Sequence, residues 1–290
     1  MTKLKFIFLA ILSVFLWTGE TTAQVLDPSE APLDGVYSKS KNNANRKPIP
    51  YVKLREADVM WLKRTWRIVD MEEKMNQVFY YPKKPTQGRK NFVQIIMDAI
   101  MEEGSLQPYA ASVDGTENDM FQVPMTPEEV GEVFVYKSTF ADIDEQGNTI
   151  DTEVENEIPL SEITKFKIKE EVFFDNERSV LEFRILGIAP IVPKIDADGE
   201  VEGYQEEFWI YFPEARFVFA ENEVFNRQND VHRMTYDDLF WKRMFASRVV
   251  KESNVYDRKL EDYLSPMDAL LEAEEIERTI FNFEHDLWSF

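Results

Sequence analysis

The side chains that most often carry out catalysis are scarce in this chain. It contains no cysteine and only two histidines, His232 and His285. A catalytic histidine needs an oriented partner and a substrate pocket, and neither residue sits in a sequence context of that kind. A G-x-S-x-G elbow, a phosphate-binding glycine loop and an H-E-x-x-H pair are also absent from the sequence. We therefore predict two surface histidines, no metal or cofactor, and a protein that is not an enzyme.

Carboxylates are the abundant chemical group, with 54 Asp and Glu residues in the chain. Asp142-x-Asp144-x-Gln146-Gly147 with Glu153 matches parts of a calcium-binding EF-hand loop, but position five is Gln and no helical pattern flanks it. An ordinary solvated loop is the preferred interpretation. Two alternatives to a structural protein stay open. One is a periplasmic hydrolase that uses paired carboxylates, and the other is a calcium-dependent periplasmic adaptor.

The strongest helical pattern covers residues 54–75, which contain neither Gly nor Pro. At helical spacing the apolar side chains fall on two faces, which predicts a helix that is buried on two sides. Such a helix either crosses the interior of its own domain, which we prefer, or presents its second face to a partner. Tryptophan and arginine are favoured at interface centres. The residues of these types that we predict as partner contacts are Trp61, Arg64, Trp66 and Arg67.

The remaining patterns alternate between helical and extended. Helices are expected at residues 91–103, from Thr126, at 213–220, from Thr235, and from Ser265 to about residue 283. A period of two at residues 163–174 and 180–188 predicts a hairpin with one buried side. Residues 208–212 add a strand, and residues 78–81 form a short extended segment. The predicted fold class is α+β, a small antiparallel sheet flanked by helices with an extended N-terminal arm.

The first residues predict export. A basic start with Lys3 and Lys5 precedes an apolar run of about a dozen residues and a small-x-small site that ends at Ala23. The run is shorter than the roughly 20 apolar residues of a membrane-spanning helix. We predict a cleavable signal peptide at residues 1–23, an extended proline-containing arm at 24–50 and a single α+β domain at 51–290, with no membrane span in the mature protein.

Charge is distributed unevenly along the chain, whose formal net charge is −21 at pH 7. Residues 24–90 contain 14 basic and 8 acidic residues, whereas residues 91–290 contain 17 basic and 45 acidic ones. A basic leading part beside an acidic body suits head-to-tail packing between copies or docking on a charged partner, with solvated surface charge as the alternative. The sign of the net charge argues against nucleic acid as a partner.

Several strings of residues resemble those of one protein family. The strings are Asp34-Gly-Val-Tyr-Ser38, Arg46-Lys-Pro-Ile-Pro-Tyr51, Glu56-Ala-Asp-Val-Met-Trp61, Lys63-Arg-Thr-Trp-Arg67, Phe208-Trp-Ile-Tyr-Phe-Pro-Glu-Ala-Arg216, Glu223-Val-Phe-Asn-Arg-Gln-Asn-Asp230, Thr235-Tyr-Asp-Asp-Leu-Phe240 and Lys242-Arg-Met-Phe245. From the arm to about Tyr263 the chain resembles the GldN family of gliding motility proteins, also called PorN.

The resemblance implies a non-catalytic, periplasmic subunit of the type IX secretion and gliding machinery, associated through partners with the inner face of the outer membrane. It implies a homo-oligomeric ring formed with an outer-membrane lipoprotein of the GldK or PorK type. Contact with the periplasmic region of a GldM or PorM type motor subunit is also implied, and catalytic residues are not. We add Tyr37, Arg46 and Tyr51 to the predicted partner contacts, because such an arm is expected to become ordered on a partner.

Overall fold

The computed structural model describes residues 36, 45–86, 88–143, 149–196, 200–226, 229 and 231–287. By its internal contacts the chain divides into residues 1–41 and residues 42–290. The elements described below all belong to the second of these two units.

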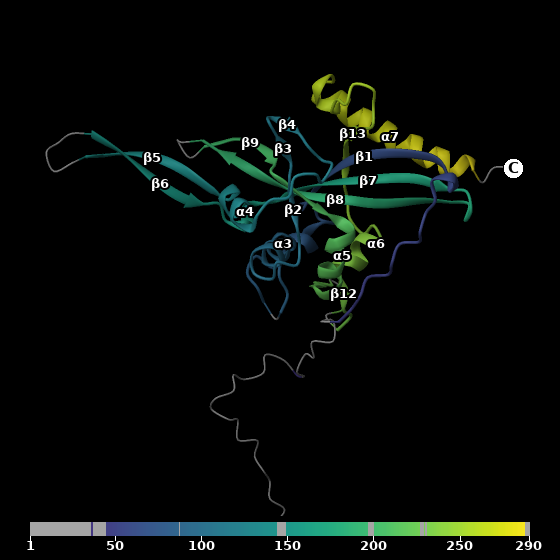
Figure 1. Cartoon of the computed structure of the whole chain (residues 1–290), viewed down its shortest axis with the longest axis horizontal. Helices are drawn as coiled ribbons and strands as arrows, with labels where there is room; N and C mark the ends of the chain where they lie inside the picture. Colours follow the sequence, from purple (N-terminus) through teal and green to yellow (C-terminus); the bar gives the residue numbers. More distant parts are fainter. Residues whose placement is uncertain are drawn as a thin grey trace, which may run out of the picture. The chain divides into compact units, whose positions relative to one another are not determined.

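An antiparallel sheet of seven strands forms the centre of this unit (Figure 1). The predicted hairpin is confirmed, because β7 (Lys165–Asp175) and β8 (Val180–Ile195) pair along the whole length of β7. On the β7 side, β1 (Val59–Asp70) follows, and β13 (Arg248–Glu252) forms the sheet edge. The strands on the β8 side are β9 (Val201–Glu206), β10 (Phe208–Tyr211) and β2 (Pro108–Ala110).

The prediction of a helix over residues 54–75 is wrong. Only one turn of 3-10 helix, η1 (Glu56–Asp58), precedes β1, which pairs with β7 from Val59 to Asp70. The segment is rich in β-branched and aromatic residues, which fit a pleated surface better than a helix. Its apolar residues occur on both sides because both faces of the sheet are covered, as in a strand buried in a layered domain.

Helices and short strands surround the sheet. The helical elements are α2 (Gln77–Tyr80), α3 (Phe92–Met101), α4 (Pro127–Val133), η2 (Leu160–Glu162), α5 (Phe212–Glu221), α6 (Tyr236–Trp241), η3 (Leu260–Asp262) and α7 (Pro266–Asp286). Two small strand pairs are β3 (Ser112–Val113) with β4 (Thr116–Glu117), and β11 (Glu223–Val224) with β12 (Met234–Thr235). The α+β class is therefore confirmed, with a larger sheet than we predicted because β1, β2, β9 and β13 join it.

Local capping explains why most helix starts were predictable. Asn91, Thr126, Thr235 and Ser265 each accept a hydrogen bond from the backbone N–H three residues later.

The prediction of a short extended segment at residues 78–81 is wrong, since residues 77–80 form α2. This helix turn buries Phe79 completely, and that packing decides the local conformation.

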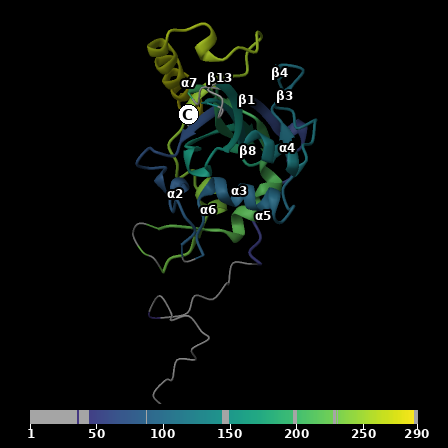
Figure 2. The same ribbon diagram turned by 90° about the vertical axis from the view of Figure 1, so that its left-hand side faces the viewer.

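Helices α2, α3, α5 and α6 lie together on one side of the sheet (Figure 2). Aromatic rings fill the core between these helices and the sheet. Phe79 lies with its ring centre 5.3 Å from that of Phe166 on β7 and 5.4 Å from that of Phe240 on α6. Phe92 of α3 lies 4.9 Å from Phe166. Edge-to-face and tilted pairs of this kind add to the burial free energy of each ring.

Two smaller clusters complete the interior. Under α7, Ala273 and Ile276 pack on Val172 of β7 and Val249 of β13. Trp66, Ala189 and Trp209 form the third cluster, together with Ala111 and Val250. Trp66 and Arg67 are neighbours on β1, so their side chains point to opposite faces of the sheet and reach different clusters.

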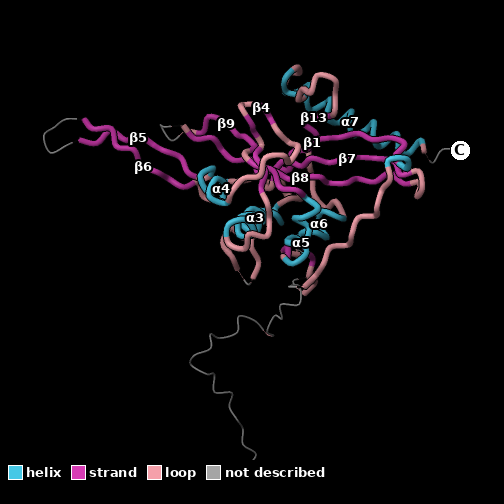
Figure 3. Tube along the Cα trace, viewed as in Figure 1, coloured by secondary structure: helices cyan, strands magenta, loops and turns pink. Residues whose placement is uncertain are grey.

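A ribbon of two strands stands apart from the main sheet (Figure 3). β5 (Val135–Ile143) and β6 (Thr149–Glu157) pair antiparallel from Val135↔Glu157 to Ile143↔Thr149. Neither strand pairs with any other strand in the described part of the chain. Figure 1 shows the ribbon extending away from the sheet beyond α4.

Across the described residues, no helix combines the length and the apolar character that crossing a membrane requires.

We expect Phe79→Ala to lower the free energy of unfolding by about 3–5 kcal/mol, because it leaves a cavity among four aromatic rings. Phe79→Leu, the control, keeps more of the buried volume and should cost less. Urea unfolding followed by fluorescence measures both. A loss below about 1 kcal/mol for Phe79→Ala would mean that this aromatic cluster is not the centre of the core.

Candidate interaction site

Residues 45–55, here called the strap, lie against the domain instead of extending away from it (Figure 1). Residues 45–50 belong to the arm that we predicted from sequence. Arg46 Nη2 forms an ion pair with Asp238 Oδ1 of α6 at 2.7 Å. Near the other end, Arg184 Nη2 of β8 donates to the carbonyl oxygen of Val52 at 3.5 Å. The strap therefore connects α6 to the beginning of β8.

Tyr51 is the aromatic anchor of the strap. Two guanidinium groups lie over its ring, that of Arg216 at 4.4 Å from the ring centre and that of Arg184 at 4.7 Å. Trp241 stacks on it with ring centres 5.8 Å apart. Burial raises the pKa of the Tyr51 hydroxyl, while the two arginines oppose that rise. Each cation–π contact of this type contributes about 0.5–2 kcal/mol, depending on exposure.

The helices position this anchor through a buried ion pair. Arg216 of α5 is 3% exposed, and its Nε donates to Asp237 Oδ1 at 2.7 Å. Asp237 lies in the first turn of α6, and Asp238 beside it completes the capping box with Thr235. Burial alone would raise the pKa of Asp238, but hydrogen bonds from Thr235 and the ion pair with Arg46 lower it below its usual value.

Beside the strap, β8 has an unpaired edge. Residues 180–185 pair with β7 on one side, and Leu186 lies at a bulge in that pairing. On the other side β10 joins β8 only at Gly187 and Ile188, and β9 only from Ile191 onward. Within the described part of the chain, no strand pairs with this outer edge. We refer to residues 180–186 as the free edge.

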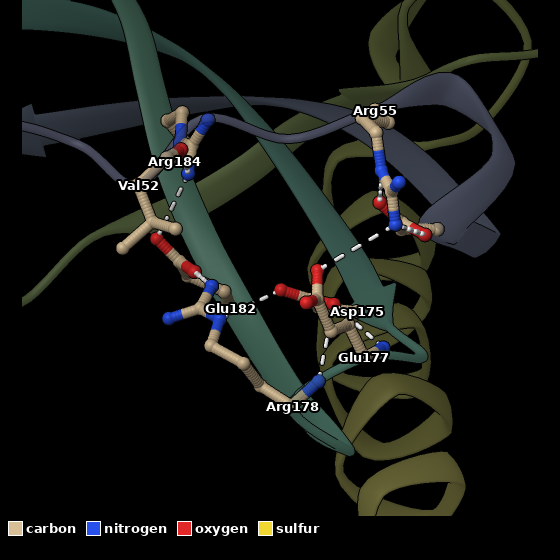
Figure 4. A network of polar contacts seen from close by, with 8 residues as sticks. Val52, Arg55, Asp175, Glu177, Arg178, Glu182 and Arg184 are labelled. Atoms are coloured by element: carbon tan, nitrogen blue, oxygen red, sulfur yellow. Dashed lines mark hydrogen bonds and ion pairs between the residues drawn. The ribbon is translucent and has the colours of Figure 1, made fainter.

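A groove of about 370 Å³ runs between the strap and the free edge. Its lining includes four consecutive residues of β8, Val180 to Phe183, so it follows the edge and not one face of the strand. Figure 4 shows the polar residues at the start of β8, where Arg178 lies between Asp175 and Glu182. The hydrogen bond from Arg178 lowers the pKa of Asp175.

The structure separates the partner contacts that we predicted on residues 54–75. Trp66 is 5% exposed, and its Nε1 donates to Asp119 Oδ2 at 2.7 Å. Arg67 is buried, forms ion pairs with Glu170 at 3.6 Å and with Glu277 of α7, and donates from Nε to Ser247. The side chains of both residues therefore make contacts inside the domain.

Trp61 and Arg64 lie nearer the surface. Trp61 stacks on Phe283 of α7 with ring centres 4.4 Å apart, and so helps to hold that helix. Arg64 keeps 40% of its side chain exposed while its Nε donates to Glu171 at 3.0 Å. Tyr37 falls outside the described residues. The structure thus brings Arg46 and Tyr51 together at the strap and distributes the other four along β1.

Sequence reasoning missed Arg184, Arg216 and Trp241, which form the seat of Tyr51. Arg216 offered one signal, because it is a charged residue inside a largely apolar helix and so needed a buried partner. The other two could not be assigned, since only tertiary packing brings β8 and α6 to the strap. Both histidines are exposed, as predicted.

One groove contains four carboxylates, those of Asp70, Glu73, Glu206 and Glu261, beside three lysines and Arg248. Asp70 forms an ion pair with Lys165, and Glu206 forms one with Lys167. Burial would raise the pKa of Glu206, but Lys167 and Lys259 outweigh it and the pKa is lowered. A glycosidase general acid needs the opposite shift. Glu206 is therefore suited to an ion-pair network.

The predicted calcium segment lies in the ribbon, and its residues 144–148 fall outside the described part. Asp142 and Glu153 belong to β5 and β6, whereas an EF-hand loop connects two helices. Among the described residues, no group of three His, Cys, Asp or Glu side chains could hold a metal ion.

A protein-family model described as gliding motility associated protein GldN matches residues 54–289. The chain belongs to the GldN family. The match covers β1, the ribbon, α5, α6 and α7. It includes all three residues that form the seat of Tyr51, and it begins within the strap. A search of curated proteins found no match. Membership of the GldN family associates the chain with the gliding motility machinery.

We expect Arg46→Ala to loosen the strap without unfolding the domain. A partly exposed ion pair contributes about 0.2–1 kcal/mol, so cleavage after Tyr51 by chymotrypsin should accelerate between about 1.4-fold and 5-fold. Lys47→Ala, a change of the exposed neighbour, is the matched control and should leave the rate unchanged. Equal acceleration in both variants would show that the Arg46–Asp238 pair does not hold the strap.

A second comparison separates interior from surface arginines on β1. Arg67→Met should cost about 3–5 kcal/mol, because it leaves the fully buried Glu170 with one cationic partner fewer. Arg64→Met should stay within about 0.5 kcal/mol of the wild type. Chemical unfolding measures both values. Similar losses for the two variants would contradict the assignment of Arg67 to the interior network.

Proposed function

We propose that the protein is a non-catalytic, periplasmic subunit of the type IX secretion and gliding machinery. In this proposal it forms a ring-like complex with an outer-membrane lipoprotein of the GldK or PorK type and contacts the periplasmic part of a GldM or PorM type motor subunit. A signal peptide at residues 1–23 delivers it to the periplasm. Membership of the GldN family supports the link to this machinery.

The observation that carries the structural role is the β5–β6 ribbon. Its two strands of nine residues pair only with each other among the described strands. An isolated two-stranded ribbon is at best marginally stable in water, and unpaired strand edges attract further pairing. A chain that retains such a ribbon is expected to cover it in an assembly.

Charge supports contacts between unlike surfaces. β6 carries four acidic residues and no basic one, whereas the strap carries four basic residues and no acidic one. Surfaces of opposite sign on one chain favour contacts between successive copies, and contacts between unlike surfaces close into rings when the rotation permits.

The test is co-expression of the mature chain with its lipoprotein partner, followed by size-exclusion chromatography with light scattering. We expect a large stable particle from the pair and smaller or heterogeneous species from the chain alone. A stable monomer that captures no partner from envelope extracts would overturn the proposal.

A ribbon-excision variant makes the test specific. The backbone N–H of Ile158 donates to the carbonyl oxygen of Phe134 at 2.7 Å, so the two ends of the ribbon are adjacent. Tyr136 packs on the core and Ser138, which pairs with Val154, is buried, so both are kept. Residues 139–153 are replaced by Asn-Gly, which suits a tight two-residue turn. We expect an unchanged melting temperature of the domain and loss of the particle. A full-size particle formed by the variant would show that assembly does not need the ribbon.

A further inference from the structure

The ribbon and the free edge are both open to pairing with a further strand. Both present unpaired backbone groups along an extended strand, nine residues in β6 and seven in the free edge. Backbone groups of this kind are satisfied either by water or by another strand. Figure 1 shows the ribbon at one end of the main sheet and the start of β8 towards the other end. The two elements of one chain are therefore not placed to pair with each other.

Charge selects β6 as the strand that fits the free edge. The groove beside the edge is lined by three arginines, Arg178, Arg216 and Arg243, against two acidic residues, Glu182 and Asp237. The strap on its outer side adds four basic residues. β6 supplies Asp151, Glu153, Glu155 and Glu157, whereas β5 contains one basic and one acidic residue. An acidic strand is electrostatically favoured between the arginines and the strap.

Side chains along the edge leave room for an added strand. Val180 is 36% exposed, and Leu181, Glu182 and Phe183 are half-buried. The Nε atom of Arg184 is buried and has no hydrogen-bond partner among the described residues, so this edge strand retains an unused donor. The strap is held over the groove by the Arg46–Asp238 ion pair, the hydrogen bond from Arg184 to Val52 and the Tyr51 ring contacts. None of its residues belongs to the buried clusters, so an outward shift leaves those clusters in place.

We propose that β6 of one copy adds as a strand to the free edge of β8 in the next copy, with the basic strap closing over it. The occupant is thus a second copy of this chain, and the mode of binding is strand addition, in which backbone hydrogen bonds supply affinity and charge supplies selectivity. Because the two surfaces differ, the contact is head-to-tail and leaves one ribbon and one free edge open for further copies. This inference rests on the proposed function, since it describes how ring subunits join.

Cysteine cross-linking tests the contact, because the chain contains no cysteine of its own. One copy carries Val180→Cys, and a second copy, with a size tag, carries Glu155→Cys. Both are co-expressed with the lipoprotein partner and treated with a short bismaleimide. A link between the two sizes then joins two copies. The matched control replaces Val180→Cys by Val201→Cys, an exposed valine on β9 away from the free edge.

We expect the Val180–Glu155 link to exceed the Val201–Glu155 link by at least about fivefold. Adding Glu157→Lys to the tagged copy should reduce the first link by a similar factor, because it places like charges together. A particle that forms normally but shows equal linking at Val180 and Val201 would overturn this inference and leave the proposed function intact. The absence of any particle would overturn the proposed function, and this inference with it.

Discussion

Pairing of β7 on both of its sides is the constraint on which the rest of the fold depends. All eleven of its residues pair with β8, and nearly all of β1 pairs with it on the opposite side. This arrangement commits residues 59–70 to a strand in spite of their helical pattern. It also creates two broad faces that must be covered. On one face of β7 lie the aromatic core with α2, α3, α5 and α6 and, further along the strand, the cluster under α7. The cluster of Trp66 and Trp209 covers the opposite face.

The strands at the centre also carry charged groups into the interior, and each is paired there. Glu170 is fully buried and contacts Arg67 and Arg243, whose Nη1 lies 2.7 Å from Glu170 Oε2. On the other face Lys169 pairs with Asp119 at 3.2 Å, and burial lowers its pKa in spite of that partner. Such groups cost free energy when unpaired. They therefore favour one arrangement of β1, β7 and the following loops.

The β5–β6 ribbon and the free edge of β8 depart from this pattern of complete pairing. They leave backbone groups to the solvent, and they carry charges of opposite sign nearby. The same chain that pairs its interior charges thus leaves strand edges open at the ribbon and at β8. In a subunit of a larger machine this combination is physically reasonable, since a rigid core can present unpaired edges without exposing apolar surface.

The sequence by itself determined the features whose causes are local. The helix starts at Asn91, Thr126, Thr235 and Ser265 depend on a capping side chain three residues from its donor, and the β7–β8 hairpin depends on alternation around one turn. The strings of residues that resemble the GldN family were also sufficient to predict the family, and the family match confirmed that prediction.

Tertiary structure alone decided the identity of β1, the helical state of α2 and the seat of Tyr51. In β1 an apolar pattern on two sides fits either a helix or a strand, and only pairing with β7, about 100 residues away, distinguishes them. The seat of Tyr51 joins Arg184, Arg216 and Trp241 from three separate elements. No local pattern encodes such contacts, because they arise from the packing of elements that are distant in sequence.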